Sequence, residues 1–324
     1  MSSLQTCIRT AVAVLFLALA LSAVAPAQVV GGAISGTVFD QSNASIGQAS
    51  VVIRNEETGS QRRLTTNSDG TFSAPSIPIG TYTVSVEHDG FASEKRTGIA
   101  VTIGQAVQLR FVLYLGKVEQ VVTVADVPQG VDTTTQQTQG LVNERQVKEL
   151  PLNGRSFDQL LMLNPASINY TTQRSGGVGT SNSSVGNIFS VSGRRPQDNL
   201  FLLNGIEYTG ASLINVTPGG TSGQLLGVEA VREFNVVSDT YGANYGKRTG
   251  AQISIVTASG TDSLHGSVYE FFRNSALDAR NYFDQAQIPP FQRNDFGAAL
   301  GGPLRHDKVF LFGNYEGYRQ HLGL

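Results

Sequence analysis

Cysteine is almost absent from the sequence, and histidine is rare. The single cysteine, Cys7, lies in an N-terminal segment that we expect to be removed, so we predict neither disulfide nor thiolate chemistry in the mature chain. The four histidines are far apart, and none belongs to a zinc-binding H-E-x-x-H arrangement. The glycine-rich runs at 220–223 and 242–248 each fall one residue short of a nucleophile elbow or a phosphate loop. The sequence therefore predicts no catalytic residue, no metal and no cofactor, and we do not expect an enzyme.

An excess of one charge is also missing. The 23 basic residues are scattered against 25 acidic ones, and no basic stripe exists that could follow a phosphate backbone, so nucleic acid is not a predicted partner. Charged residues make up 15% and hydrophobic residues 40% of the chain. Such a composition suits a β-rich soluble protein and also an outer-membrane barrel, because only the lipid-facing half of each barrel strand must be apolar.

The N-terminal segment has the features of an export signal. Arg9 and the amino terminus supply positive charge, Ala11–Ala25 is apolar, and Ala25-Pro26-Ala27 has the small-x-small pattern of a cleavage site. The apolar run is shorter than the ~20 residues that span a bilayer. We predict a signal peptide over 1–27, cleaved after Ala27. No second apolar run of helical length follows, so a mature protein held in a membrane would be held by strands.

Residues 33–115 alternate apolar and polar side chains in short runs separated by turn residues. This pattern predicts an antiparallel β-sandwich, with Val107, Leu109, Phe111 and Leu113 on one face of its last strand. The stretches SGTVFD and NSDGTFSAPSIPIGTYTVSVEHDGF resemble the carboxypeptidase-regulatory-like domain, a transthyretin-like sandwich. The resemblance implies an accessory module without catalytic machinery.

That fold is grouped with carbohydrate-binding-like sandwiches, so aromatic rings on this module are candidate sugar contacts. Tyr82, His88 and Phe91 are the residues concerned. The strand positions of Tyr82 and Phe91 favour a place in the core instead.

Residues 140–259 carry a second set of motifs. We predict helices over Asn143–Glu149 and Phe157–Leu163, and the stretches FSVSGRRPQDNLFLLNGIEY, VEAVREFNVV and YGANYGKRTGAQISIVT follow in order. They resemble the plug domain of TonB-dependent outer-membrane receptors, in which a Gly-Arg pair (Gly193 and Arg194) precedes a strand that ends in an Asn-Gly turn (Asn204 and Gly205). The resemblance also implies a buried closing strand at Ala251–Thr257. LPLNGRSFDQLL and FRNSALDARNYF are most similar to the Oar-like subgroup of these receptors.

The linker 116–139 contains a segment that resembles a TonB box. In that family the box is an extended peptide that adds as a strand to TonB, and β-branched residues favour extended backbone. The same residues would also suit the last strand of the preceding sandwich. The predicted TonB-interacting residues are Glu119, Gln120, Val121, Val122, Thr123 and Val124.

In this family ion pairs and hydrogen bonds lock the plug to its barrel. The resemblance implies that role for Arg194, Arg195, Glu229, Arg232 and Glu233. A solvated polar face is the alternative for each of them.

Residues 260–324 resemble the start of the barrel, with room for about three strands of ~10 residues. Three strands cannot close a barrel, so we expect the chain to be an N-terminal fragment or a truncated reading frame. The aromatic residues suited to the membrane interface are Tyr269, Phe283, Phe310, Tyr315 and Tyr318. The predicted fold is thus mainly β: a transthyretin-like sandwich, an α+β plug and the first strands of an incomplete outer-membrane barrel.

The resemblance implies TonB-dependent transport of a solute across the outer membrane of a Gram-negative cell into the periplasm. Its implied partners are TonB with its inner-membrane energising complex, outer-membrane lipid, and a ligand that the sequence leaves open among siderophore, glycan, cobalamin and peptide. The alternative is a ligand-binding or carbohydrate-binding protein of the cell surface or periplasm that transports nothing.

Overall fold

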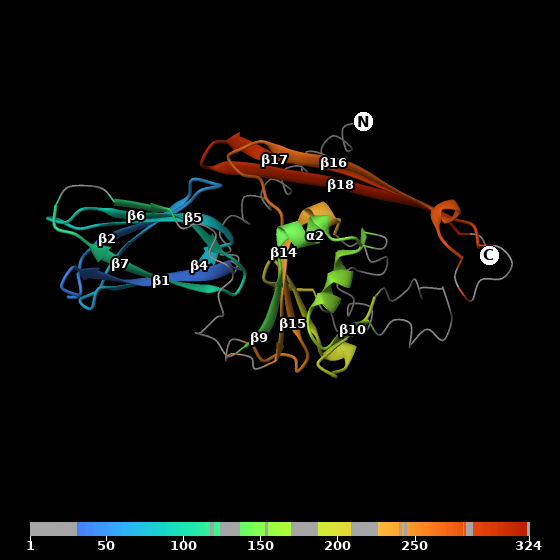
Figure 1. Ribbon diagram of the computed structural model, residues 1–324, viewed down its shortest axis with the longest axis horizontal. Helices are drawn as coiled ribbons and strands as arrows, with labels where there is room; N and C mark the ends of the chain where they lie inside the picture. Colours follow the sequence, from blue (N-terminus) through green and yellow to red (C-terminus); the bar gives the residue numbers. More distant parts are fainter. Residues whose placement is uncertain are drawn as a thin grey trace, which may run out of the picture.

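The chain folds into three parts, which the computed structural model describes over residues 31–116, 120–123, 137–152, 155–169, 187–208, 226–239, 242, 245–280, 282 and 288–322. An N-terminal sandwich is followed by a plug-like domain and by a long three-stranded sheet (Figure 1). The fold is mainly β, as predicted. The predicted signal peptide lies outside the described residues.

The sandwich consists of a three-stranded sheet, in the order β4-β1-β7, and a five-stranded sheet, in the order β3-β2-β5-β6-β8. One expectation was wrong: β1 pairs with β7 in parallel, so the module is not purely antiparallel. Strands that begin and end the module are not joined by a hairpin, and their relative direction is therefore free. The strands are β1 Gly31–Asp40, β2 Ser50–Asn55, β3 Gln61–Thr65, β4 Thr71–Pro78, β5 Gly80–Glu87, β6 Glu94–Val101, β7 Ala106–Leu113 and β8 Gln120–Thr123.

The core of the sandwich lies between its two sheets. Because side chains alternate along a strand, the apolar residues of each strand meet in one layer. Phe111 and Leu113 are fully buried there, and Val107 and Leu109 pack against the layer, as predicted. Tyr82 is also buried in this core, and its hydroxyl donates to the carbonyl of Pro78 at 2.7 Å.

The plug-like domain is built on a five-stranded sheet in the order β13-β12-β15-β14-β9. The predicted closing strand is confirmed, because β15 (Gln252–Thr257) lies at the centre of the sheet. The predicted turn is confirmed as well: Asn204 and Gly205 have φ of 48° and 82° and link β12 to β13. The remaining strands are β9 Thr138–Val142, β12 Leu200–Leu203, β13 Ile206–Glu207 and β14 Val231–Asp239, with the separate pair β10 Ser167–Asn169 and β11 Phe189–Val191.

Short helices cover this sheet. Helix α2 (Glu144–Glu149) begins at Asn143, whose side chain forms a reciprocal capping box with Gln146. The second predicted helix, η2 (Phe157–Leu163), is a 3-10 helix, and Ser156 gives it no side-chain cap. The stretch VEAVREFNVV forms the 3-10 helix η5 (Val228–Ala230) and the first residues of β14.

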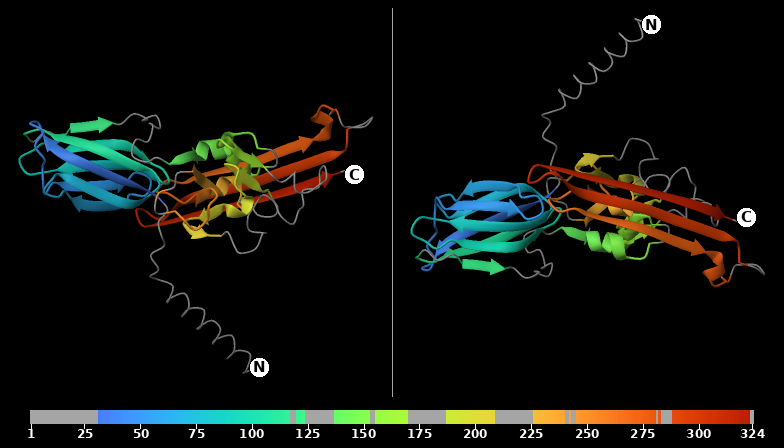
Figure 2. Two further views of the ribbon diagram at one scale, coloured as in Figure 1. Left: turned by 90° about the horizontal axis from the view of Figure 1, so that it is seen from below. Right: turned by 90° about the horizontal axis from the view of Figure 1, so that it is seen from above.

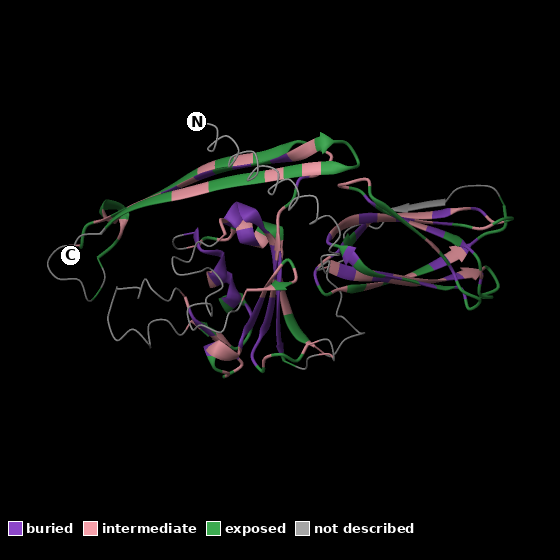
Figure 3. Cartoon of the chain, turned by 180° about the vertical axis from the view of Figure 1, so that it is seen from behind, coloured by how far each residue is buried: buried purple, intermediate pink, exposed green. Residues whose placement is uncertain are grey.

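The third part, which we call the wall sheet, contains β16 (His265–Asn274), β17 (Phe291–Arg305) and β18 (Val309–Leu322) in antiparallel order. It lies along one side of the plug-like domain, and the sandwich lies beyond one end of that domain (Figure 2). Burial is concentrated inside the sandwich and the plug-like domain, whereas most of the wall sheet is exposed (Figure 3). No helix among the described residues has the length and apolar character needed to cross a membrane.

Candidate functional site

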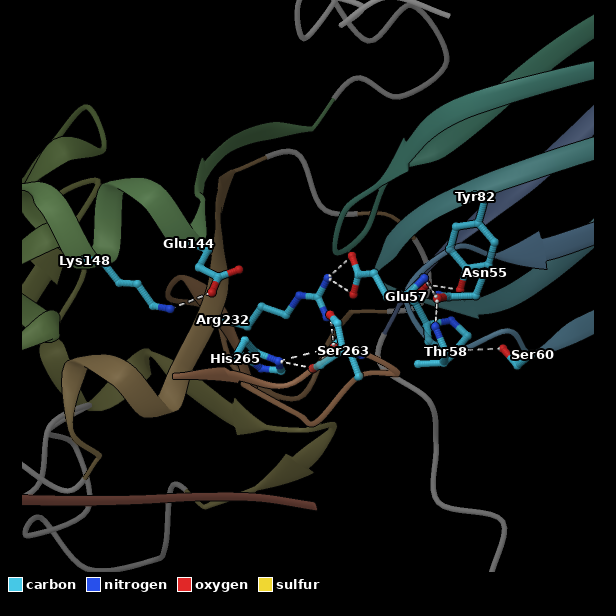
Figure 4. A network of polar contacts seen from close by, with 12 residues as sticks. Asn55, Glu57, Thr58, Ser60, Tyr82, Glu144, Lys148, Arg232, Ser263 and His265 are labelled. Carbon is cyan, nitrogen blue, oxygen red and sulfur yellow. Dashed lines mark hydrogen bonds and ion pairs between the residues drawn. The ribbon is translucent and has the colours of Figure 1, made fainter. Parts of the chain in front are cut away.

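Strand β14 carries the contacts between the plug-like domain and the sandwich. One guanidinium nitrogen of Arg232, Nη2, donates to both carboxylate oxygens of Glu57 on the sandwich, at 2.8 and 2.7 Å (Figure 4). The side chains are only 18% and 28% exposed, so water screens this pair less than an ordinary surface pair. The ion pair therefore fixes one point of attachment between the two domains.

A second point of attachment lies one residue further along β14. The turn after β6 presents Ile103, whose amide donates to Oε1 of Glu233 at 2.6 Å and whose carbonyl accepts from Nδ2 of Asn235 at 3.4 Å. Gly104 in the same turn has a φ of 73°, and an added Cβ would lie 3.1 Å from Asn235. The turn can thus approach β14 closely because it carries glycine.

The attachment by Glu233 places a carboxyl group in a buried position. Burial raises the pKa of Glu233 to about 7, against the opposing effects of the Ile103 amide and the Arg232 guanidinium. The protonated form is therefore favoured inside the interface relative to water.

The edge strand β9 contacts the same part of β14. It pairs antiparallel with β14 between Thr138 and Val142, and Asn235 Nδ2 also donates to Oε1 of Gln139 at 3.1 Å. Asn235 thus connects β14 to the sandwich and to the first strand of the plug-like domain. Gln139 of β9 is therefore bonded to a residue that also contacts the sandwich.

The segment that leads into the wall sheet also contacts this junction. The amide of Asp262 donates to the carbonyl of Glu57 at 2.8 Å, and Asp262 Oδ1 accepts from the amide of Asp307 in the short β17–β18 turn at 2.8 Å. A cavity of about 270 Å³ lies between the three parts and is lined by Glu57, Arg232, Lys148 and His265 among others. Sandwich, plug-like domain and wall sheet therefore meet at one place.

The wall sheet is held to the plug-like domain by its inner face. Glu316 on β18 accepts from the amide of Val228 at 3.2 Å and from the Tyr269 hydroxyl at 2.5 Å. The guanidinium of Arg155 lies over the rings of Phe271 and Tyr269, at 4.3 and 5.4 Å from their centres. These contacts define which side of each strand faces the plug-like domain.

The outer face of the wall sheet is largely apolar. Side chains alternate along a strand, so the neighbours of Tyr269, Phe271 and Glu316 point away from the plug-like domain. The outward residues include Val268, Phe272, Leu300, Leu311 and Tyr315, all exposed, and Val268 is 87% exposed. Glu270 is a charged member of the same face. An apolar outer face over a polar inner face is the pattern of a barrel wall in lipid.

The aromatic residues predicted for the membrane interface are divided by this alternation. Tyr315 lies on the outer face and is 67% exposed, in agreement with the prediction. Tyr269 was assigned wrongly, because its hydroxyl donates inward to Glu316. By strand register Phe310 and Tyr318 share the inner side with Glu316, and Phe283 lies outside the described residues.

The predicted TonB box lies partly within the described residues. Gln120–Thr123 form β8, which pairs in parallel with β6 at the edge of the five-stranded sandwich sheet. Glu119 and Val124 lie outside the described residues. The alternative of a last sandwich strand is therefore realised in this structure, and binding to TonB stays a prediction.

The five charged residues predicted to contact the barrel have different neighbours. Arg194 donates to the carbonyl of Ser238 at 2.8 Å and pairs with Asp239, and Arg195 is exposed. Glu229 lies 3.4 Å from Lys148. In the described part of the chain Arg232 and Glu233 contact the sandwich. The role of all five residues against a barrel stays a prediction.

Residues that the sequence analysis missed complete the junction. Glu57 and Ile103 lie in turns of the sandwich, and nothing local distinguishes them from other turn residues. Glu316 offered a signal, because it is an acidic residue inside the aromatic-rich stretch KVFLFGNYEGY. Arg155 carries no such signal in the sequence. Its burial and its φ of 55° are visible only in the folded structure.

Two of the aromatic residues considered as sugar contacts lie in or against the core of the sandwich. Tyr82 belongs to the core, as favoured by its strand position, and Phe91 packs partly buried against that core with its ring 5.6 Å from His88. Within the described residues no group of three His, Cys, Asp or Glu side chains could hold a metal ion.

Comparison with known proteins agrees with this architecture. Residues 33–114 match the carboxypeptidase regulatory-like domain, and residues 256–324 match an outer membrane beta barrel domain. The TonB-dependent transporter Oar of Myxococcus xanthus is 24% identical over 299 residues, which cover 87% of this chain and 26% of the transporter. The chain thus spans about a quarter of the length of this curated relative.

Solved structures give weaker likenesses. The siderophore receptor PirA from Acinetobacter baumannii is 21% identical, with a TM-score of 0.39, over 55% of this chain and 24% of the receptor. A chain of a type II cohesin-X-dockerin complex from Acetivibrio cellulolyticus is 21% identical, with a TM-score of 0.22, over 27% of this chain and 60% of that chain.

The architecture, the two domain matches and the similarity to the transporter Oar define an outer-membrane protein with a β-sandwich ahead of a plug-like domain and barrel strands. Within that class, the chain resembles the Oar-like TonB-dependent receptors.

Proposed function

We propose that this chain supplies the sandwich, the plug and the first wall strands of an outer-membrane transporter that moves a solute into the periplasm when TonB pulls on the plug. The observation that carries the proposal is the arrangement of β14. This strand is joined to the edge strand β9, to the sandwich turn at Ile103 and, through η5, to the wall residue Glu316.

The direction of the wall sheet supports a periplasmic sandwich. Barrel strands are joined by short turns on the periplasmic side and by longer loops outside. Residues 306–308 join β17 to β18, whereas residues 275–290 join β16 to β17. The sandwich contacts the short turn end, since Glu57 is bonded to Asp262 and Asp262 to Asp307. The sandwich and the TonB-box segment are therefore assigned to the side on which TonB acts.

The outer face of the wall sheet supports contact with lipid. Val268, Phe272 and Leu300 expose apolar side chains that no described element covers. Burying such side chains in hydrocarbon is favourable by about 1.5–3 kcal/mol each. We assign this face to the lipid of the outer membrane.

The connection of the plug-like sheet supports force coupling. Strand β9 follows the TonB-box segment in the chain and lies at the edge of the sheet. Among the described strands, it pairs with β14 alone. A pull on the preceding segment would break the β9–β14 pairs in turn. It would also move Asn235, which bonds both Gln139 and the sandwich.

Crosslinking to TonB tests this function. In the whole protein in outer membranes, Val122→Pro removes a backbone donor that strand addition needs, and Val122→Thr keeps the β-branched shape and the donor. We expect the proline variant to assemble normally and to lose crosslinking to TonB and uptake, while the threonine variant keeps both. Unchanged crosslinking of the proline variant would contradict the assignment of the box. Assembly without any TonB-dependent uptake would favour the non-transporting binding protein.

A further inference from the structure

The outer edge of β6 is occupied by a segment of the same chain. Strand β8 pairs with it in parallel, in the register Glu94 with Gln120, Lys95 with Val121, Arg96 with Val122 and Thr97 with Thr123. These four residues of β8 are four of the six predicted to bind TonB. The same backbone is thus already engaged as an added strand.

The receiving strand is firmly anchored in the sandwich. Glu94 is buried, and its carboxylate accepts from Nε of Arg96 at 3.0 Å and from the amide of Val112 on β7 at 2.9 Å. The bond to Val112 attaches the start of β6 to the facing three-stranded sheet. The edge of β6 is therefore a preformed template for another strand.

The length of the ladder has a physical limit at Gly98. This residue has a φ of 75°, and its amide donates a hydrogen bond to Oε1 of Glu56 at 3.0 Å. The left-handed conformation interrupts the regular strand directly after Thr97. The site thus accepts a segment of about four residues, the length of β8.

We propose that the β6 edge is a strand-addition site that holds the TonB-box segment in cis and competes with TonB for it; this inference rests on the proposed function. A segment held on β6 is withheld from TonB, so no pull reaches β9, which follows β8 in the chain. TonB therefore moves the plug only after the segment leaves β6. Four parallel pairs without a hairpin form a short ladder, which suits reversible release.

A reversible crosslink across the ladder tests the proposal. Lys95 and Val121 are register partners, and neighbouring strands lie about 4.8 Å apart, within the reach of a disulfide. Cys7 is the sole native cysteine. In the whole protein in outer membranes, the double variant Lys95→Cys/Val121→Cys is compared with Lys95→Cys alone and with wild type, each oxidised and reduced. The probe is the purified periplasmic domain of TonB.

We expect the double variant to form the disulfide and to bind the probe at least tenfold more weakly in its oxidised form. Reduction should restore its binding. Wild type and Lys95→Cys alone should bind the probe equally in the oxidised and reduced states. Failure to form the disulfide in the absence of TonB would overturn the cis pairing. Equal binding by the oxidised and reduced forms would overturn the competition, because TonB would then use another edge, and the proposed function would stand. Absence of binding by wild type and by every reduced form would overturn the proposed function and this inference with it.

Discussion

Arg232 and Glu57 are 175 positions apart in the chain, and a single guanidinium nitrogen of Arg232 bridges both carboxylate oxygens of Glu57. The pair joins the central plug-like sheet to a turn of the sandwich. The carbonyl of Glu57 also accepts from the amide of Asp262 at the start of the wall sheet. The relative placement of the three parts therefore depends on this turn.

Loss of this pair is expected to loosen the sandwich from the plug-like domain. Arg232→Gln removes charge-assisted bonds between partly buried groups, for which we expect a loss of about 1–2 kcal/mol in docking free energy. The measurement is hydrogen exchange at the Ile103 amide, which should become faster in the variant. Arg145→Gln is the matched control, because Arg145 pairs with Glu149 on an exposed helix surface, and it should leave this exchange unchanged. Unaltered protection in Arg232→Gln would show that the pair does not hold the domains together.

Docking of the sandwich is expected to weaken as the pH rises towards neutrality. The pKa of Glu233 is about 7 in the folded protein, above the 4.5 of an unperturbed glutamate. Because the docked protein holds the Glu233 proton more tightly, protonation stabilises docking fully below pH 4.5. This stabilisation is lost as the pH rises through the folded-state pKa of about 7. The difference corresponds to a loss of about 3 kcal/mol at most between pH 4.5 and pH 8. Ile103 exchange, corrected for its intrinsic pH dependence, reports the change.

Glu233→Gln separates this effect from other titrations. The amide cannot ionise and still offers an oxygen to Ile103, so the variant should dock at pH 8 as firmly as at pH 5. Asp158, whose pKa burial raises to about 6, titrates in the plug-like domain with the same sign and remains present in the variant. Glu87→Gln, at an exposed site on the sandwich, should retain the full pH dependence. If Glu233→Gln retains it too, another group is responsible.

Glu316 is expected to hold the wall sheet to the plug-like domain. Glu316→Ala removes the acceptor of the Val228 amide and of the Tyr269 hydroxyl, and we expect about 1–3 kcal/mol of local destabilisation. Faster hydrogen exchange at Val228 would reveal it. Tyr315→Phe changes the adjacent outward-facing residue and should leave Val228 protected. Equal exchange in the two variants would mean that the bond to Glu316 contributes nothing to this attachment.

The outer face of the wall sheet is expected to reject charge. Val268→Arg places a guanidinium on the apolar outer face, with an expected cost of about 2–4 kcal/mol if that position lies near the middle of the bilayer. Assembly of the whole protein in the outer membrane should fall, as measured by the heat-modifiable band on gels. Val268→Leu keeps the position apolar and should assemble normally. Normal assembly of the arginine variant would place this face away from lipid.

Much of the local structure follows from short sequence patterns. Alternation predicted the sandwich strands, and the resemblance to receptor plugs predicted the turn at Asn204 and Gly205, two residue types that accept positive φ at low cost. Asn143 at the start of α2 is a local signal, because asparagine is a favoured N-cap residue. Which residues of the wall strands face the plug-like domain could not be predicted from residue type. Tyr269 and Tyr315 are both tyrosines, and only the strand register places Tyr269 inside and Tyr315 outside.

The sequence by itself determined the strands of the sandwich, because alternation and turn chemistry act between residues close together in the chain, and its resemblance to known receptors determined the order of the three parts. Only the tertiary structure decided that Arg232 meets Glu57, that Ile103 meets Glu233, and that β8 lies on β6. These contacts join residues separated by long stretches of chain, and each depends on how whole domains dock. Glu233 acquires its raised pKa only from the burial that docking creates.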